Sequence, residues 1–167
     1  MRIRAKVGTV RVKLDFAGKA QRAAVMATQM VAPELNAAFQ DAMGSPVWQW
    51  PRETIRRGSL DSRGRRGPGY RVFSPRNIVD QGRLRQSNEY RITGLLIMFM
   101  WTEPYAAAVH YGAEIYPWGD KTKEKVKLPA RPWTDAVLGT IVNPGIEPYP
   151  IALQWKTAFT SAWRKIK

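Results

Sequence analysis

The sequence contains no cysteine and a single histidine, His110. Without cysteine, disulfide frameworks, thiolate zinc sites and cysteine nucleophiles are excluded, and the chain fits a reducing cytosol. One imidazole is too few for a multi-histidine metal site and leaves at most one group for acid–base chemistry near neutral pH. We interpret His110, between Val109 and Tyr111, as a packed or hydrogen-bonded structural residue.

Acidic residues are also scarce, with 13 Asp and Glu against 27 Lys and Arg. They are scattered, and no pair or triplet has metal-ligand spacing, which disfavours a two-metal nuclease. Residues 64–69 are glycine-rich but lack the lysine followed by Ser or Thr of a phosphate-binding loop. No serine lies in a nucleophile-elbow pattern. The sequence therefore predicts a protein that is not an enzyme and that uses no cofactor or metal.

Long apolar runs are missing as well. The most apolar stretch, residues 94–101, ends at Thr102 and Glu103, and it is too short to cross a bilayer. The first residues alternate charged with apolar side chains, unlike the continuous apolar core of a secretory signal. We expect a soluble protein with no signal for export and no membrane partner.

Hydrophobic residues make up 44% of the 167 positions, including seven Trp, six Tyr and five Phe, which is enough for one compact domain spanning residues 1–167. The formal net charge of +14 is large for a chain of this size. Such an excess favours binding to nucleic acid or to an acidic protein, and charge alone does not distinguish the two.

Periodicity predicts most of the elements. In residues 2–16 every second side chain is apolar, and the phase of this alternation changes at Gly8 and Thr9. This pattern fits a short hairpin or one strand with a bulge, and we favour the bulge. Residues 18–43 repeat apolar positions every three or four residues and predict an amphipathic helix, with a kink or break at Pro33. The Gly-Ser-Pro sequence at 44–46 is a typical helix stop.

The second half of the chain starts with an Arg-rich and Gly-rich stretch. Residues 48–91 lack apolar periodicity and predict a long irregular loop centred on 62–69, of the kind that carries function or orders on binding a partner. Two strands joined near Thr93 and Gly94 follow, and then a helical turn that ends at Gly112. We expect an exposed turn or hairpin tip at 116–127 and an extended segment at 128–133.

The last segment, residues 151–166, places apolar side chains on one stripe and most of its cations elsewhere. It predicts a C-terminal amphipathic helix. Its last cations also complement the helix dipole.

Three landmarks occur in order: DQGRLRQS at 80–87, YAAAVHYG at 105–112 and LPARPW at 128–133. Together with a long helix before them and a helix after them, they resemble the neck and tail-completion proteins of tailed bacteriophages, the head–tail joining and tail-terminator-like proteins. The resemblance covers roughly residues 17–167. Two departures are an insertion at about 48–77, longer than expected, and a Pro-rich detour at 143–150.

The resemblance implies an α+β fold: an antiparallel sheet packed against a long N-terminal helix, with a C-terminal amphipathic helix and a long basic loop. It implies a homo-oligomeric ring, a hexamer or dodecamer, at the head–tail junction of the virion, made in the cytoplasm of a bacterial host. Partners would be copies of the chain, an adjacent connector or head-completion ring and tail-tube proteins. DNA would pass through the lumen without sequence-specific contact.

Candidate interface residues combine Arg for docking charge with aromatic anchors, the types that protein interfaces favour. Arg131, between two prolines, would bond to a backbone carbonyl, to a carboxylate of a neighbouring subunit or to a carboxylate of its own chain. In the rival interpretation, a small basic nucleic-acid-binding protein uses the same loop on DNA or RNA. The candidates are Trp48, Trp50, Arg63, Arg65, Arg66, Tyr70, Arg71, Phe73, Arg131 and Trp133.

Overall fold

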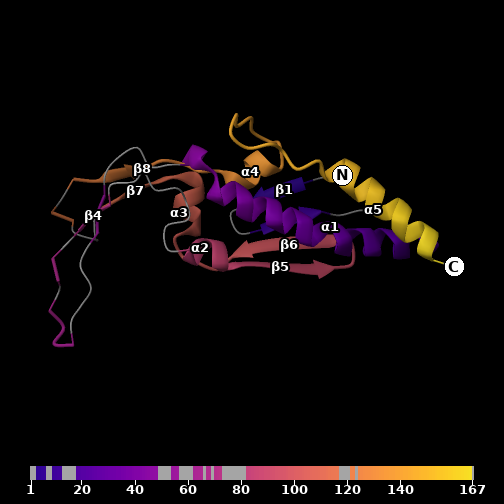
Figure 1. Cartoon of the computed structure of the whole chain (residues 1–167), viewed down its shortest axis with the longest axis horizontal. Coiled ribbons are helices and arrows are strands. Elements are labelled where there is room, and N and C mark those ends of the chain that lie inside the picture. The colour runs from indigo at the N-terminus through magenta and orange to yellow at the C-terminus, as the bar shows by residue number, and fades with distance from the viewer. Residues whose placement is uncertain are drawn as a thin grey trace.

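The structure is a computed structural model with an α+β fold, as expected. A long N-terminal helix packs against a C-terminal helix and against antiparallel strands (Figure 1). For residues 3–6, 9–12, 54–56 and 70–72 only the backbone is described. The described residues are 3–6, 9–12, 18–48, 54–56, 62–65, 67–68, 70–72, 82–116, 121–122 and 124–166.

Helix α1, Lys19–Gly44, is the central element of the body. Its buried stripe recurs at three- and four-residue steps and includes Ala27, Val31, Leu35 and Phe39. Of the kink or break expected at Pro33, the break is absent, because the helix continues through this position. Pro33 lies on the exposed side of the helix, as does Gln29, whose carbonyl loses its amide partner and can face water instead.

Helix α1 packs against the antiparallel pair β5, Asn88–Thr93, and β6, Leu96–Trp101. This confirms the two expected strands, joined at Gly94 with φ 59°. Buried and half-buried residues alternate along β6, so that one face of the strand packs into the core. Phe39 of α1 meets the ring of Phe99 edge-on at a centroid distance of 5.0 Å and that of Trp101 at 5.7 Å.

The N-terminal strands form a hairpin, β1, Ile3–Lys6, paired antiparallel with β2, Thr9–Val12. Our prediction of one strand with a bulge is therefore wrong, and the short hairpin is the alternative that the structure shows. The register sets Ile3 opposite Val12 and Ala5 opposite Val10, so the apolar positions of the two phases are cross-strand partners. A tight hairpin thus produces the same phase change as a bulge. Strand β2 also runs alongside β6, which joins the two hairpins.

The stretch 48–91 is more regular than expected. A short 3-10 helix, Pro46–Trp48, follows α1, and β3, Thr54–Arg56, pairs antiparallel with β4, Tyr70–Val72. Helix α2, Arg83–Gln86, and β5 then end the stretch. Three-residue strands carry too little periodicity to stand out in a sequence dominated by Arg and Gly.

An arm extends to one side of the body (Figure 1). It contains the β3–β4 pair and a second antiparallel pair, β7, Ala113–Ile115, with β8, Val126–Leu128. The described residues around Arg63 and Arg65 lie at its far end, and the β7–β8 pair confirms the expected hairpin. We use the word arm for these two strand pairs and the segment 62–65.

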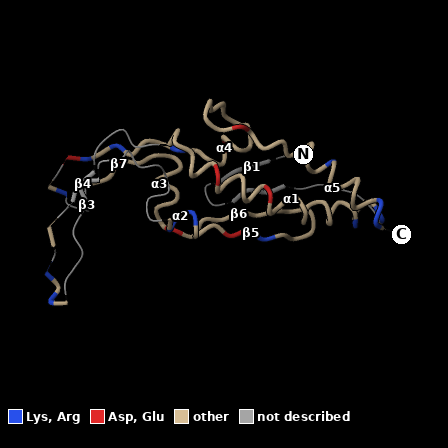
Figure 2. Tube along the Cα trace, in the orientation of Figure 1, with Lys and Arg blue, Asp and Glu red and all other residues tan. Residues whose placement is uncertain are grey.

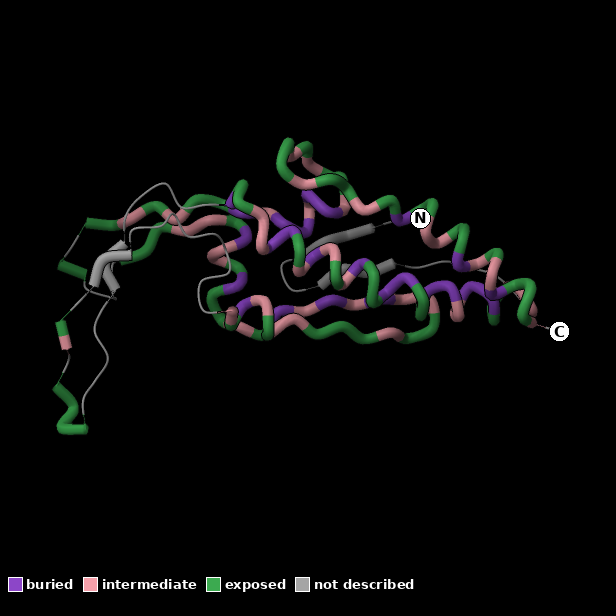
Figure 3. Tube along the Cα trace, in the orientation of Figure 1, coloured by how far each residue is buried: buried purple, intermediate pink, exposed green. Residues whose placement is uncertain are grey.

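Three more helices complete the fold. Helix α3, Ala106–Tyr111, ends at Gly112 as expected. Residues 129–132 have no regular secondary structure and end in a turn, in which the amide of Trp133 donates to the carbonyl of Arg131 at 2.8 Å. Trp133 then begins α4, Trp133–Val137, which the sequence did not predict. Helix α5, Ile151–Lys165, confirms the C-terminal helix, and its Ala158 packs with Ala27 and Val31 of α1. Figure 3 shows buried residues along α1 and on α5 and β6, which each pack on α1.

Candidate interaction surface

His110 is the natural place to look for catalysis, because it is the single imidazole. Its Nε2 atom lies 2.7 Å from Oγ1 of Thr134 and 4.0 Å from Oδ2 of Asp135. The rings of Tyr111 and Trp133 both meet the imidazole edge-on at 4.7 Å. Burial lowers the pKa of His110, and the negative charge of Asp135 opposes this in part.

This arrangement does not form a nucleophile. The side chains of His110 and Thr134 are both 2% exposed, so no substrate reaches the hydroxyl oxygen. Asp135 lies on the same ring nitrogen as Thr134, whereas an orienting carboxylate binds the opposite nitrogen. The contact instead links α3 to α4. Within the described ranges, no three or more His, Asp or Glu side chains gather closely enough to hold a metal ion.

Three of the candidate interface residues are buried within the subunit. Trp48 is 6% exposed, and its indole N–H donates to the carbonyl oxygen of Ala42 at 2.7 Å. Trp133 is 1% exposed and packs edge-on against Trp101 at 5.5 Å. Arg131 is 7% exposed, which places its side chain inside its own chain. These residues support the fold of the subunit rather than present a surface.

Four further candidates belong to the arm. Arg63 and Arg65 are exposed at its far end, where Figure 2 shows basic residues. Tyr70 and Arg71 lie in β4, opposite Arg56 and Ile55 of β3. The structure therefore places these four on one projecting element, away from the buried three. Trp50, Arg66 and Phe73 lie outside the described residues.

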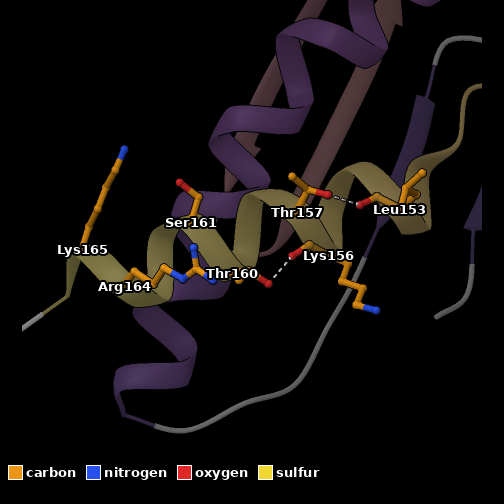
Figure 4. A pocket seen from close by; sticks show the side chains of 7 residues that line it. All are labelled: Leu153, Lys156, Thr157, Thr160, Ser161, Arg164 and Lys165. Carbon is orange, nitrogen blue, oxygen red and sulfur yellow. Dashed lines mark hydrogen bonds between the residues drawn. The ribbon is translucent and has the colours of Figure 1, made fainter.

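A second basic surface, absent from the candidates, runs along the outer side of α5. We call it the α5 outer face (Figure 4). It frames a shallow, open depression of about 540 Å³ whose lining comes from this one helix, so it is not an enclosed small-molecule pocket. From the sequence, we predicted only that these cations lie outside the apolar stripe of the C-terminal helix, and we did not predict a surface. The face consists of Leu153, Lys156, Thr157, Thr160, Ser161, Arg164 and Lys165.

Two structural contacts hold α5 in place on α1. Ala158 and the half-buried Trp155 and Phe159 form a small cluster with α1 residues. Before the start of α5, the hydroxyl of Tyr149 donates to Oε2 of Glu34 at 2.6 Å. Burial is the main cause that raises the pKa of Tyr149, and the hydrogen bond to Glu34 raises it further. The apolar side of α5 is thus occupied by the subunit itself, and its outer face is left to solvent.

Comparison with known proteins finds no matching family model, no matching curated protein and no matching solved structure. None of the helices in the described part of the chain has the length and apolar character required to span a membrane. A function must therefore be inferred from the arm, from the α5 outer face and from the sequence landmarks.

Proposed function

We propose that this chain is a structural subunit of a homo-oligomeric ring at the head–tail junction of a tailed bacteriophage, as a neck, tail-completion or tail-terminator protein. The observation that carries the proposal is the arm, which reaches beyond the core formed by α1, α5 and β6 (Figure 1). A projecting segment presents surface that a neighbouring subunit or ring can cover, and contacts made on docking offset the conformational entropy lost when such a segment is ordered.

The composition of the arm supports docking rather than turnover. Its far end exposes Arg63 and Arg65, and its β4 strand carries Tyr70 and Arg71. Arg and Tyr are enriched where protein surfaces bind each other strongly. An arm on each subunit that contacts a different surface of the next is a heterologous interface, and such interfaces close into rings when the rotation permits.

The body supports the same proposal. A sheet packed against a long helix, followed by a C-terminal helix, is the arrangement that the landmark resemblance implies for a ring subunit. The landmark at 105–112 forms α3 and its terminal Gly112, and the landmark at 128–133 leads from β8 into α4. The ring would be a hexamer or dodecamer that contacts a connector or head-completion ring and tail-tube proteins in the virion.

The test removes residues 62–69 from the gene in the phage that encodes it. The expected result is a folded protomer, judged by circular dichroism, that fails to join heads to tails. A control variant replaces the same residues by Gly and Ser at equal length, which keeps the reach of the arm but removes its charge. Unchanged yield of complete particles from the deletion would refute the proposal.

One observation favours a second candidate, a small basic nucleic-acid-binding protein. The α5 outer face carries three exposed cations, and α5 contains no acidic residue. This candidate requires a monomer that binds nucleic acid with sub-micromolar affinity, which falls steeply with salt. The ring proposal instead predicts large particles and weak, sequence-independent DNA binding. Sedimentation and salt titration of the purified protein separate the two.

A further inference from the structure

The α5 outer face is a strongly basic surface, and within the described part of the chain no ion pair joins its three cations to a carboxylate. Lys156, Arg164 and Lys165 are all exposed, and no Asp or Glu occurs anywhere in α5. The start of α1 adds cations at the same end of the molecule, because the Nζ atom of Lys19 lies 5.0 Å from the ring centroid of Trp163 and Arg22 is one turn further along. This end of the body therefore attracts a polyanion.

The apolar side of α5 argues against an anionic membrane as the partner. Amphipathic helices bind lipid by burying their apolar side in the bilayer. Here Ile151, Ala158 and Ala162 are buried within the subunit, with Trp155 and Phe159 half-buried beside them. Most of the apolar side is therefore occupied within the subunit, and the remaining exposure of Trp163, 42%, is too little for the helix to insert into a bilayer.

The residue types of the face favour nucleic acid over an acidic protein. Protein interfaces are depleted in Lys and are centred on buried aromatic or Arg anchors, whereas phosphate oxygens are contacted by Lys, Arg, Ser and Thr. Two Lys, one Arg and three hydroxyl residues make up six of the seven lining residues. Leu153, 61% exposed, is the one apolar side chain among them and lies at one end of the face.

The surroundings of Trp163 favour a duplex over a single strand. Single-strand binders stack bases on free aromatic rings. The ring of Trp163 stacks on Phe159 at 6.0 Å with an interplanar angle of 28°, and Lys19 lies over the ring. With the ring engaged by both residues, no base can stack on it as on a free platform.

The hydroxyls of the face add little sequence discrimination. Thr157 donates to the carbonyl of Leu153 at 3.0 Å, and Thr160 donates to that of Lys156 at 2.9 Å. These two protons are used within the helix, so the attractive contacts to phosphate come mainly from the cations. Contacts of that kind are Coulombic and do not read the bases.

We propose that the α5 outer face binds the phosphate backbone of duplex DNA without sequence preference. Lys156 and Arg164 are separated along the helix by about 12 Å, close to the width of a major groove of about 12 Å. Lys156 and Lys165 also project to opposite sides of the helix (Figure 4). The three cations can thus contact phosphates on both sides of a groove. This inference rests on the proposed function, which places the subunit around a DNA channel. It deepens that function by assigning the side of the subunit that faces the DNA.

The test compares two triple variants with the same net charge. K156Q/R164Q/K165Q neutralises the α5 outer face, and R83Q/R91Q/K121Q neutralises three exposed cations to which neither proposal assigns a contact. Binding of full-length protein to a short duplex of random sequence is measured by fluorescence anisotropy between about 50 and 200 mM salt. We expect the α5 triple to weaken binding to the duplex roughly ten- to a hundredfold. The slope of the logarithm of the binding constant against the logarithm of the salt concentration should become less steep by about 0.9 for each phosphate that the variant no longer neutralises.

The control triple should change the affinity far less, with a nearly unchanged slope. Equal losses in the two triples would show that only net charge matters and would overturn the proposal. A second probe, poly-L-glutamate, represents an acidic protein. If the α5 triple reduced binding to this polymer but not to DNA, the face would belong to a protein partner and the proposal would be wrong.

The same variants separate this inference from the proposed function. If the α5 triple loses DNA binding but wild-type protein never assembles or joins heads to tails, the DNA contact stands and the ring proposal fails. If wild-type protein assembles while the α5 triple binds DNA normally, the ring stands and the DNA-facing assignment fails.

Discussion

The imidazole of His110 and the hydroxyl of Thr134 are within hydrogen-bonding distance, 2.7 Å, in a site where both side chains are buried. The other ring nitrogen, Nδ1, has no hydrogen-bond partner among the described residues. Protonating the ring would give this nitrogen a proton with no acceptor in a site that water does not reach. The folded protein therefore favours the neutral imidazole, which agrees with the lowered pKa of His110.

Stability should consequently decrease as the pH falls below the unfolded-state pKa of His110, about 6.5. Above that value the ring is neutral in both states. As the pH falls through it, the unfolded chain binds a proton that the folded chain does not, until the lower folded-state pKa is reached. Urea unfolding from about pH 7.5 to about pH 5.5 should show this decrease, at no more than about 1.4 kcal/mol per pH unit.

The control for this pH dependence is His110→Gln. Because the chain has one histidine, the variant has no side chain with an ordinary pKa in this window. Its free energy of unfolding should be lower at neutral pH but nearly constant across the window. Parallel profiles for the wild type and His110→Gln would show that another group titrates.

Gly112 should tolerate no side chain. It has φ 79° and ψ 162°, a region that is essentially restricted to glycine, and a Cβ there would lie 2.8 Å from the carbonyl oxygen of Leu128 and 2.9 Å from the amide nitrogen of Ala130. We expect Gly112→Ala to lower the free energy of unfolding by about 3 kcal/mol or more, from backbone strain and overpacking together.

The matched control is Gly94→Ala in the β5–β6 turn. Gly94 has φ 59°, but nothing lies within 4 Å of a Cβ built there. This variant should cost only about 1–2 kcal/mol, the strain of a left-handed residue. Equal costs for the two variants in urea unfolding would mean that the close approach of β8 to Gly112 is unimportant.

Most of the fold could be predicted from the sequence where periodicity extends over many residues. Helices α1 and α5 and the β5–β6 pair follow directly from their apolar patterns. The hairpin β1–β2 was ambiguous in principle, since a two-residue turn and a bulge both shift the phase of alternation. The β3–β4 pair and α4 could not be predicted, because elements of three to five residues contain less than two periods.

The candidate surface was less predictable than the fold. Composition alone pointed to Arg63 and Arg65, which the structure places on the arm. Trp48 and Trp133 were chosen because interfaces favour Trp, but protein cores favour large aromatics as well, and only the tertiary structure distinguishes the two. The α5 outer face was missed because Lys156 is eight residues before Arg164, and the sequence pattern showed only that these cations lie off the apolar stripe, not that the fold leaves this side of the helix exposed.

Trp48 provides a direct test of its structural role. Replacing it by Phe removes the indole N–H that donates to the Ala42 carbonyl, which also accepts a bond from the amide of Ser45 at 3.1 Å. Because the carbonyl keeps one donor, Trp48→Phe should lower the free energy of unfolding by only about 1 kcal/mol. Urea unfolding measures this, and assembly should be unaffected. Unchanged stability together with a failure to assemble would instead assign Trp48 to an interface.

The last prediction concerns Pro33, inside α1. A proline in a helix interior is about 3 kcal/mol less favourable than alanine, and Pro33 lies on the exposed side of α1. Pro33→Ala should therefore raise the free energy of unfolding by about 1–3 kcal/mol, the lower figure allowing for the greater freedom of the unfolded chain without proline. Met30→Ala, on the same exposed side with Met30 42% exposed, is the control and should change stability by less than about 0.5 kcal/mol. Destabilisation by Pro33→Ala would mean that the proline shapes α1 for a contact outside the described subunit.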